Sequence, residues 1–157
     1  MGRGIGGGPD TTPSMIVKMM TGEQKGSPYF WNVPVDICDV ALAHARALTR
    51  EKAANKRFLV VGDESFWMVE MANKLADSLE EAGYDYPVSR STFSKPTMWV
   101  MSKFVPAIKG AIPLINLQYN FNCKLSHLIL GIEYNRNAKE LLFEMAEHLI
   151  KTGKVPE

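Results

Sequence analysis

Two stretches of the chain repeat hydrophobic residues at helical spacing. Residues 66–82 follow Ser65 and end before Gly83, which predicts an amphipathic helix with Ser65 as its N-cap. Residues 138–152 predict a second helix between Asn137, the expected N-cap, and Gly153, the expected terminator. The inner stripes consist of Phe66, Val69, Ala72, Leu75, Ala76 and Leu79 in the first helix, and of Leu141, Leu142, Met145, Leu149 and Ile150 in the second.

Four shorter helices are expected where an apolar segment lies between a capping residue and a breaker. Short polar side chains satisfy the free N–H groups of a first turn, and glycine ends a helix at low steric cost. A proline ends or kinks a helix. The segments are residues 15–21, with Ser14 as N-cap and Gly22 as terminator; residues 39–50, with Asp39 as N-cap; residues 97–108, interrupted by Pro106; and residues 123–130, closed by Gly131.

Few segments have the pattern of a strand. Residues 57–61 are short, mostly apolar and stopped by Gly62, which is typical of a strand buried on both faces of an α/β sheet. Residues 33–36 contain a proline and an aspartate, so a short edge strand or an extended loop is expected there. Residues 116–122 predict a short extended segment. The sequence therefore predicts an α/β fold with only one to three strands, a small sheet for this chain length.

The composition is that of an ordinary globular protein. The 157 residues suit one domain, and 46% hydrophobic with 22% charged residues supports a buried core. The formal net charge of +1 gives no field for nucleic acid or for an acidic membrane surface. The sequence shows neither a hydrophobic signal core nor an apolar run near the ~20 residues that span a bilayer. We therefore expect a cytoplasmic protein with neither nucleic acid nor membrane as a partner.

Local motifs supply no strong cofactor or metal site. Gly2, Gly4 and Gly7 spell G-x-G-x-x-G, but this motif binds a dinucleotide only between a strand and a helix. Residues 1–13 are instead expected to form a glycine-rich loop. Cys38 and Cys123 fit neither a zinc spacing nor a disulfide framework, which predicts two free thiols. No His, Cys or Asp cluster has the spacing of metal ligands.

The titratable residues are explained more simply by structure than by catalysis. The three histidines are far apart in the sequence, and no nucleophile motif accompanies them. The corner that joins residues 33–36 to the next helix carries Asp36 and Asp39. Helix capping and loop hydrogen bonding account for both carboxylates. The histidines are His44, His127 and His148.

The same corner resembles a known family. Residues 35–44 read Val-Asp-Ile-Cys-Asp-Val-Ala-Leu-Ala-His, similar to the V-D-V-R-D-V-A-x-A-H segment of the extended short-chain dehydrogenases/reductases. The resemblance is to the dihydroflavonol reductase, cinnamoyl-CoA reductase and aldehyde reductase branch of the NAD-dependent epimerase/dehydratase superfamily. It covers nearly the whole chain, in the order of the family's C-terminal half. The other matching pieces are Gly8-Pro9, Thr12 with Ser14, Met20–Gly22, Arg57–Leu59, Phe66–Leu79, Asn122 with Lys124, Leu130–Tyr134 and Leu149–Gly153.

This resemblance implies a partial Rossmann-like α/β fold without the N-terminal cofactor-binding half. The family's Tyr-x-x-x-Lys pair is also missing. In that pair the tyrosine acts as general acid, and the lysine lowers the pKa of the tyrosine and holds the ribose of the cofactor. No catalytic residue is therefore expected in this chain, and Cys38 stands where the family usually has arginine. None of the five tyrosines is followed by a lysine four residues later, because those positions hold Val33, Val88, Arg90, Cys123 and Ala138.

The resemblance also assigns candidate binding residues. Gly8, Pro9 and Ser14 are expected near the nicotinamide of NAD(P). The alternative role is packing: the methionines of residues 15–21 suit the hydrophobic core, and the aromatic residues of the loop 23–32 suit a cover over it. The candidates for the substrate wall are Met15, Met19, Tyr29, Trp31 and Trp99.

The sequence is compatible with three functions. The first is the substrate-side portion of an NAD(P)-dependent oxidoreductase that reduces a ketone or aldehyde, inactive as an isolated chain. The second is a non-catalytic protein that keeps a reductase-derived fold and binds a partner chain or a second copy through unpaired strand edges. The third is a portion of a nucleotide-sugar epimerase or dehydratase.

Overall fold

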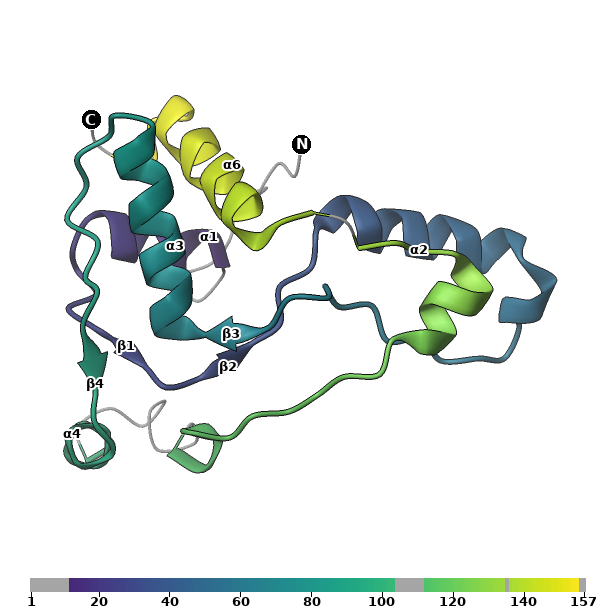
Figure 1. The fold of residues 1–157 in the computed structure, drawn as a ribbon, viewed down its shortest axis with the longest axis horizontal. Helices are drawn as coiled ribbons and strands as arrows, with labels where there is room; N and C mark the ends of the chain where they lie inside the picture. Colours follow the sequence, from purple (N-terminus) through teal and green to yellow (C-terminus); the bar gives the residue numbers. More distant parts are fainter. Residues whose placement is uncertain (1–11, 104–111, 135, 156–157) are drawn as a thin grey trace.

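Three helices form the main body of the protein. A computed structural model describes residues 12–103, 112–134 and 136–155 (Figure 1). In it, α1 (Thr12–Met20), α3 (Met68–Glu81) and α6 (Ala138–Lys151) pack together on the left of Figure 1. Their inner faces share one hydrophobic cluster, the body core, whose fully buried side chains include Ile16, Met19, Met20, Leu75 and Leu79.

The strands are few and short. Four strands of two residues each pair in two separate sheets, one more strand than the upper end of the predicted range. The mixed α/β class with a small sheet is confirmed. Strands β1 (Ser27–Pro28) and β4 (Thr92–Phe93) are parallel, whereas β2 (Trp31–Asn32) and β3 (Phe66–Trp67) are antiparallel.

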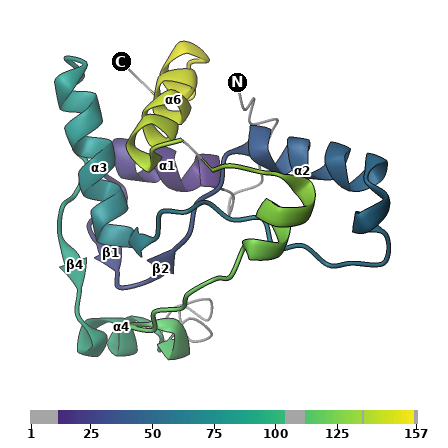
Figure 2. The same ribbon diagram turned by 45° about the vertical axis from the view of Figure 1, so that its right-hand side comes forward.

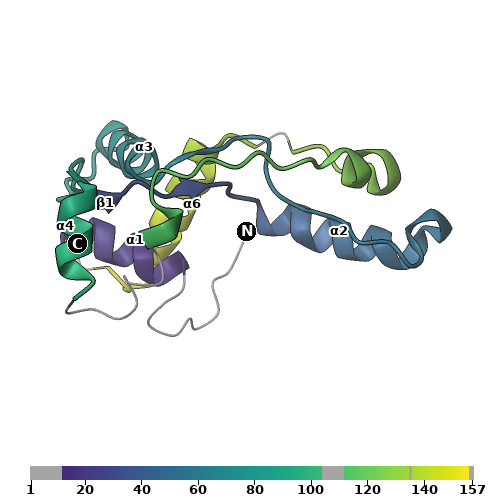
Figure 3. The ribbon, with the colours of Figure 1, turned by 90° about the horizontal axis from the view of Figure 1, so that it is seen from below.

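A long arm extends from the body, and Figure 2 shows it from a second side. It consists of residues 37–61 and 123–134, and Figure 3 shows its two layers seen from below. The arm has its own hydrophobic cluster, the arm core, separate from the body core. Its elements are α2 (Ile37–Thr49), η1 (Glu51–Ala53) and the π-helix η3 (Ser126–Leu130). The arm core contains Ala43, Ala53, Leu130, Ile132 and Tyr134.

Two arginines of the arm join its layers. Arg46 donates hydrogen bonds to the carbonyls of Leu130, at 3.0 Å, and Gly131. Arg50 donates to the carbonyl of Ile129 at 2.6 Å. These carbonyls lie at the C-terminal end of η3, where a helix leaves its last acceptors unpaired and favours cations. The arginines therefore cap η3 from the facing helix.

The corner before α2 differs from its prediction in the identity of the N-cap. Asp36, not Asp39, is extended and accepts a hydrogen bond from the N–H of Cys38 at 3.0 Å, so α2 begins at Ile37. The Asp36 carboxylate also pairs with Arg136 at 2.9 Å, and Arg136 contacts Glu144 of α6 as well. The predicted N-cap was wrong because Asp36 satisfies the first turn and the guanidinium together.

The two acids of this corner titrate in opposite directions. Burial opposes ionisation of Asp36, but the N–H of Cys38 and the guanidinium of Arg136 outweigh it and lower the pKa of Asp36. Burial and the neighbouring charge of Asp36 raise the pKa of Asp39 against the opposing effect of Arg136. Asp36 is therefore the carboxylate that stabilises the corner.

Three predicted helix starts were also wrong. Helix α1 begins at Thr12 instead of after Ser14, because Pro13 is tolerated in a first turn. Helix α3 begins at Met68, because Phe66 and Trp67 pair with β2 and the N–H of Trp67 donates to Glu70 at 2.8 Å. Ser65 is therefore not its N-cap. A further helix, α4 (Lys95–Met101), begins two residues early, with Ser94 as N-cap.

The other helix boundaries follow the sequence closely. Asn137 caps α6 by accepting from the N–H of Lys139 at 2.8 Å. Residues 124–130 are helical, and a short 3-10 turn, η2 (Ile112–Leu114), precedes them. The predicted end of α4 near residue 108 was wrong, because the helix ends at Met101 with Ser102 as its C-cap. The glycines expected as terminators have positive φ, namely Gly22, Gly83, Gly131 and Gly153.

Residues 57–61, the strongest strand prediction, belong to no sheet in the described part of the chain. They run along the arm between η1 and β3, and Phe58 and Val60 pack against the arm core. The prediction of a strand buried on both faces was wrong, because Leu59 is 40% exposed and pairing requires a neighbouring strand that the described residues do not provide. Residues 116–122 likewise pair with none of the described strands.

Candidate functional site

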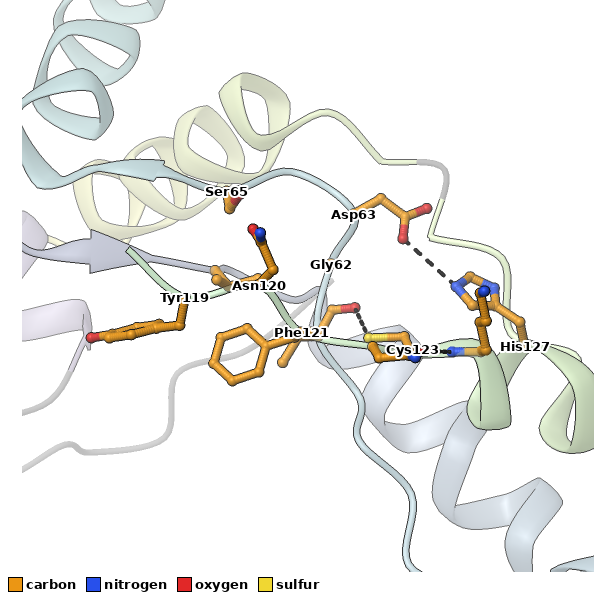
Figure 4. A pocket seen from close by; sticks show the side chains of 12 residues that line it. Gly62, Asp63, Ser65, Tyr119, Asn120, Phe121, Cys123 and His127 are labelled. Carbon is orange, nitrogen blue, oxygen red and sulfur yellow. Dashed lines mark hydrogen bonds and ion pairs between the residues drawn. The ribbon is translucent and has the colours of Figure 1, made fainter. Parts of the chain in front are cut away.

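A cavity of about 340 Å³ lies where the arm meets the body (Figure 4). Two segments form its walls, residues 61–65 and residues 119–127, and Val33 closes one side. The first wall connects the unpaired segment to β3, and the second leads into η3. Residues far apart in sequence therefore meet at this point. The polar residues in the lining include Asp63, Ser65, Asn120, Asn122 and His127.

Gly62 allows the first wall to lie directly against the corner before α2. Its N–H donates to the carbonyl of Pro34 at 2.9 Å, and a Cβ at this position would lie 2.3 Å from the same oxygen. The contact ties the corner before α2 to the cavity wall. Only a residue without a side chain permits this approach of two backbones.

We expect Gly62→Ala to lower the free energy of unfolding by about 1–3 kcal/mol, because two backbones must separate to admit the methyl group. Chemical denaturation followed by circular dichroism measures this change. Gly153→Ala is the comparison for backbone strain without a close contact, since no atom lies within 4 Å of its Cβ position but alanine is strained at its φ of +67°. A loss no larger than that of Gly153→Ala would contradict the close contact at Gly62.

A histidine and an aspartate face each other across the cavity. The His127 Nε2 and Asp63 Oδ1 atoms are 3.7 Å apart, and Figure 4 shows them extending from opposite walls. The His127 ring also packs edge-on against Tyr134, with centroids 5.1 Å apart. This packing fixes the imidazole while leaving about a third of the side chain exposed, at 35%. His127 is thus held in position and accessible to a ligand.

Cys123 lines the same cavity but lacks the environment of a nucleophile. Burial raises the pKa of its thiol, the hydrogen bond to Val61 opposes this, and the charge of Asp63 raises it further. The thiol therefore stays protonated at neutral pH, whereas reactive cysteines have a lowered pKa. Neither Cys123 nor Cys38 forms a disulfide, as predicted. The cavity is thus suited to binding by hydrogen bonds and not to covalent attack by this cysteine.

An aromatic cluster adjoins one end of the cavity. The ring of Trp67 contacts Tyr29 at 5.6 Å and Trp31 at 4.9 Å between centroids, edge-on in both cases. The indole N–H of Trp31 donates to the carbonyl of Tyr119, a cavity residue, at 3.0 Å. The N–H of Asn116 donates to Tyr29. The predicted wall residue Trp31 is therefore joined to the second wall and Tyr29 to the segment just before it, but neither side chain lines the cavity.

The remaining predicted site residues lie elsewhere. Met19 is 1% exposed in the body core, and Met15 packs against that core. Both methionines therefore pack in the core, which was the alternative to a place in the substrate wall. Trp99 is exposed on α4, where Lys103 lies over its ring. Ser14 is inside α1. None of these four lines the cavity. Gly8 and Pro9 lie outside the described residues, and the assignment of all these residues to cofactor or substrate stays a prediction.

Sequence reasoning missed Asp63, Asn120 and His127 as cavity residues. Two weak signals were available. Asp63 follows an apolar segment and a glycine, and open α/β sheets bind ligands beyond the carboxyl ends of their strands. Cys123 and His127 are four residues apart in a predicted helix, hence on one face. The meeting of the two walls depends on tertiary structure, which neither signal contained.

The turn before α3 does not fit the phosphates of a dinucleotide. The turn before α3 has one glycine, Gly62, followed by the acidic Asp63 and Glu64. The N–H of Trp67 at the start of α3 is already occupied by the Glu70 carboxylate. A pyrophosphate requires a glycine-rich turn and free N–H groups at a helix N-terminus, and acidic side chains repel it. The part of the chain that the structure describes also contains no His, Cys, Asp or Glu cluster able to hold a metal ion.

Comparisons with known proteins give a likeness of fold. No protein-family profile and no curated protein matches the sequence. Among solved structures, gox2253 is similar over 94% of this chain and 46% of its own, with TM-score 0.69 and 19% identity. PA4631, a nucleoside-diphosphate-sugar epimerase from Pseudomonas aeruginosa, is similar over 92% of this chain and 44% of its own, with TM-score 0.68 and 16% identity.

These values place the chain in a structural class. None of the described helices is long and apolar enough to cross a bilayer. The chain spans about half the length of the structures that it matches. At such low identity the likeness concerns the fold alone, and it agrees with the expected architecture. The protein has a partial Rossmann-like α/β fold, mostly helical and with few strands.

Proposed function

We propose that this chain is the substrate-side portion of an NAD(P)-dependent oxidoreductase that reduces a ketone or aldehyde. The observation that carries the proposal is the extent of the structural match, which covers 94% of this chain and 46% of gox2253. The chain corresponds to part of a larger Rossmann-like architecture. The sequence resemblance to the C-terminal half of the extended short-chain dehydrogenases/reductases, in the epimerase/dehydratase superfamily, gives that part its role.

In this proposal the chain binds and orients the substrate. The bound cofactor supplies the hydride and is held by a polypeptide half that carries the glycine-rich turn. Asn120 and His127 offer hydrogen-bonding groups in the cavity, and Trp31 and Trp67 offer an apolar boundary beside it. The sequence lacks the Tyr-x-x-x-Lys pair, so the isolated chain has no general acid of that kind. We therefore expect no hydride transfer by the isolated chain.

A nucleotide-sugar epimerase or dehydratase is the second candidate for the parent enzyme. The likeness to PA4631, described as a nucleoside-diphosphate-sugar epimerase, favours it. The polar lining of the cavity suits sugar hydroxyls, which need several hydrogen-bonding partners at once. The two candidates differ in the ligand that the cavity accepts. Acetophenone and UDP-glucose are suitable probes of the two classes.

Tryptophan fluorescence tests the binding role directly. Trp31 and Trp67 lie beside the cavity, so Trp99→Phe removes the one other tryptophan and isolates their signal. In this background we expect acetophenone to bind, and His127→Ala to weaken binding by about tenfold through loss of a polar contact. His44→Ala is the matched control, because His44 is exposed on α2 and lies outside the cavity lining.

The outcomes separate the candidates. Binding of UDP-glucose without acetophenone would favour the epimerase-type parent. Binding of neither probe, with a normal circular dichroism spectrum, would contradict a substrate-side role. NADPH oxidation by the isolated chain with acetophenone would contradict its expected inactivity. Equal weakening by His127→Ala and His44→Ala would remove His127 from the site.

A further inference from the structure

The outer surfaces of the body and of the arm differ in character. Every exposed residue of the two long body helices is charged, namely Glu70, Glu80 and Glu81 in α3 and Glu140, Glu144 and Lys151 in α6. Among the described residues, six large hydrophobic side chains are exposed on the arm and none on α1, α3 or α6: Ile37, Leu42, Leu48, Leu59, Leu125 and Leu128. The body therefore has an ordinary polar surface, and the arm has the apolar surface of an interaction site.

Helix α2 reverses the pattern of α3 and α6. Its exposed residues include no aspartate, glutamate, lysine or arginine. A stripe at helical spacing and one neighbouring side chain make up what we term the α2 face: Ile37, Ala41, Leu42, Ala45 and Leu48. The two arginines of α2 and its C-cap reach η3 on the opposite side, in the second layer of the arm (Figure 3). The α2 face is therefore directed away from the rest of the arm.

The polar side chains that are exposed on α2 bind its own backbone. The Nδ1 atom of His44 donates to the carbonyl of Val40 at 2.7 Å. The hydroxyl of Thr49 donates to the carbonyl of Ala45 at 3.2 Å. Burying a polar group is costly only when its hydrogen bonds to water are not replaced. A partner can therefore cover this side of α2 at a small cost of desolvation.

The size of the α2 face indicates a partner that also covers more of the arm. Helix α2 has 13 residues. Its exposed side is thus about 20 Å long and about 10 Å wide, an area of about 200 Å². A standard interface buries about 800 Å² on each partner. A second copy of α2 packed on this helix alone falls short of that area. A partner of the size of a domain can cover α2 together with Leu59, Leu125 or Leu128.

We propose that the α2 face packs against a second polypeptide, which carries the glycine-rich turn and holds the NAD(P) cofactor. The structural matches cover 46% of gox2253 and 44% of PA4631, so more than half of each of those chains has no counterpart here. Layers of an α/β fold join through apolar faces. The α2 face is such a surface, whereas α3 and α6 are charged on the outside. This inference rests on the proposed function, which assigns the cofactor to another half.

Retention on NADP⁺-agarose tests the partner. The purified chain alone should pass through the resin, because the turn before α3 does not fit the phosphates of a dinucleotide. After mixing with an extract of the native host, the chain should be retained and then released by NADPH. Mass spectrometry of the eluate should identify a partner whose sequence has a glycine-rich turn after its first predicted strand.

Ala45→Glu tests the surface. Ala45 lies in the middle of the α2 face and is exposed, so the fold should tolerate the change. Retention should fall by about tenfold, because the complex would bury a carboxylate without a counter-charge. Ala82→Glu is the matched control, the same change at the exposed C-cap of α3 on the body, and should leave retention unchanged. Both variants should keep the circular dichroism spectrum and the acetophenone affinity of the Trp99→Phe background.

Four outcomes would overturn the proposal. They are no retention of the unaltered chain in the presence of extract, retention without extract, equal retention of Ala45→Glu and Ala82→Glu, and a dimer of the unaltered chain that Ala45→Glu dissociates in sedimentation velocity. The last would make a second copy the occupant of the α2 face. None of the four contradicts the proposed function as long as the cavity binds acetophenone. Failure of that binding would contradict the proposed function itself.

Discussion

Replacing Leu75 with alanine is expected to lower the free energy of unfolding by about 3 kcal/mol. Leu75 is 0% exposed in the body core, where α3 packs against α6. Removing a buried leucine side chain loses the free energy gained by transferring it out of water. It also leaves a cavity that the neighbouring side chains fill only partly. Globular domains are stable by about 5–15 kcal/mol, so this one change removes a large share of the total.

Urea denaturation followed by circular dichroism measures the effect. Leu48→Ala is the matched control, because Leu48 lies near the end of α2 with 89% of its surface exposed. We expect the control to stay within about 0.5 kcal/mol of the unaltered chain. Similar losses from the two variants would mean that α3 does not pack as described.

Replacing Asp36 with alanine is expected to cost about 2–3 kcal/mol. The change removes the N-cap of α2, typically worth about 1 kcal/mol, and the ionic hydrogen bond to Arg136. Asp36 is 7% exposed, so its carboxylate interacts with these partners in place of water. Arg136 keeps its contact with Glu144, which limits the penalty of leaving its charge without Asp36. Chemical denaturation at neutral pH measures the loss.

The effect of this substitution depends on pH in a defined direction. Because folding lowers the pKa of Asp36, the carboxylate stabilises the fold fully above its ordinary pKa of about 3.9. This contribution is lost as the pH falls through the lower value of the folded state. The difference in stability between the unaltered chain and Asp36→Ala should therefore shrink below about pH 4. A difference that is constant between pH 7 and pH 3 would contradict the ion pair.

Asp39→Asn is the internal control for Asp36. Folding raises the pKa of Asp39, so its charge costs stability above that pKa, and the cost disappears in acid. Its place in the first turn of α2 gives a small opposing gain from the helix dipole. We expect the substitution to change stability by no more than about 0.5 kcal/mol at neutral pH. A loss as large as that of Asp36→Ala would return the capping role to Asp39.

The sequence predicted the helices better than their starts. Periodicity located α3 and α6, because their stripes face the body core directly. The start of α3 was missed because pairing of Phe66 and Trp67 with β2 competes with helix formation, and that competition depends on a strand more than thirty residues earlier. The N-cap of α2 was missed because Arg136, a hundred residues away, fixes Asp36. Local rules contain neither interaction.

The site was predictable only in part. The aromatic residues Tyr29 and Trp31 were selected by resemblance and lie in a cluster that is hydrogen-bonded to the cavity wall. His127 was set aside because its partners, Asp63 and Tyr134, reach it through folding of the arm. Residues 57–61 show the limit most clearly. Their apolar pattern predicted a strand buried on both faces, but it contains no information on a neighbouring strand, and Leu59 is 40% exposed.

The separation of the body core from the arm core makes ligand affinity depend on local unfolding. We expect the arm to open more easily than α1, α3 and α6 separate, because the arm core is smaller and depends on the two arginines that reach η3. Both cavity walls continue into that arm, so we expect a ligand of the cavity to bind only the fraction of molecules in which the arm is closed. Any partner that holds the arm closed then tightens binding without touching the ligand.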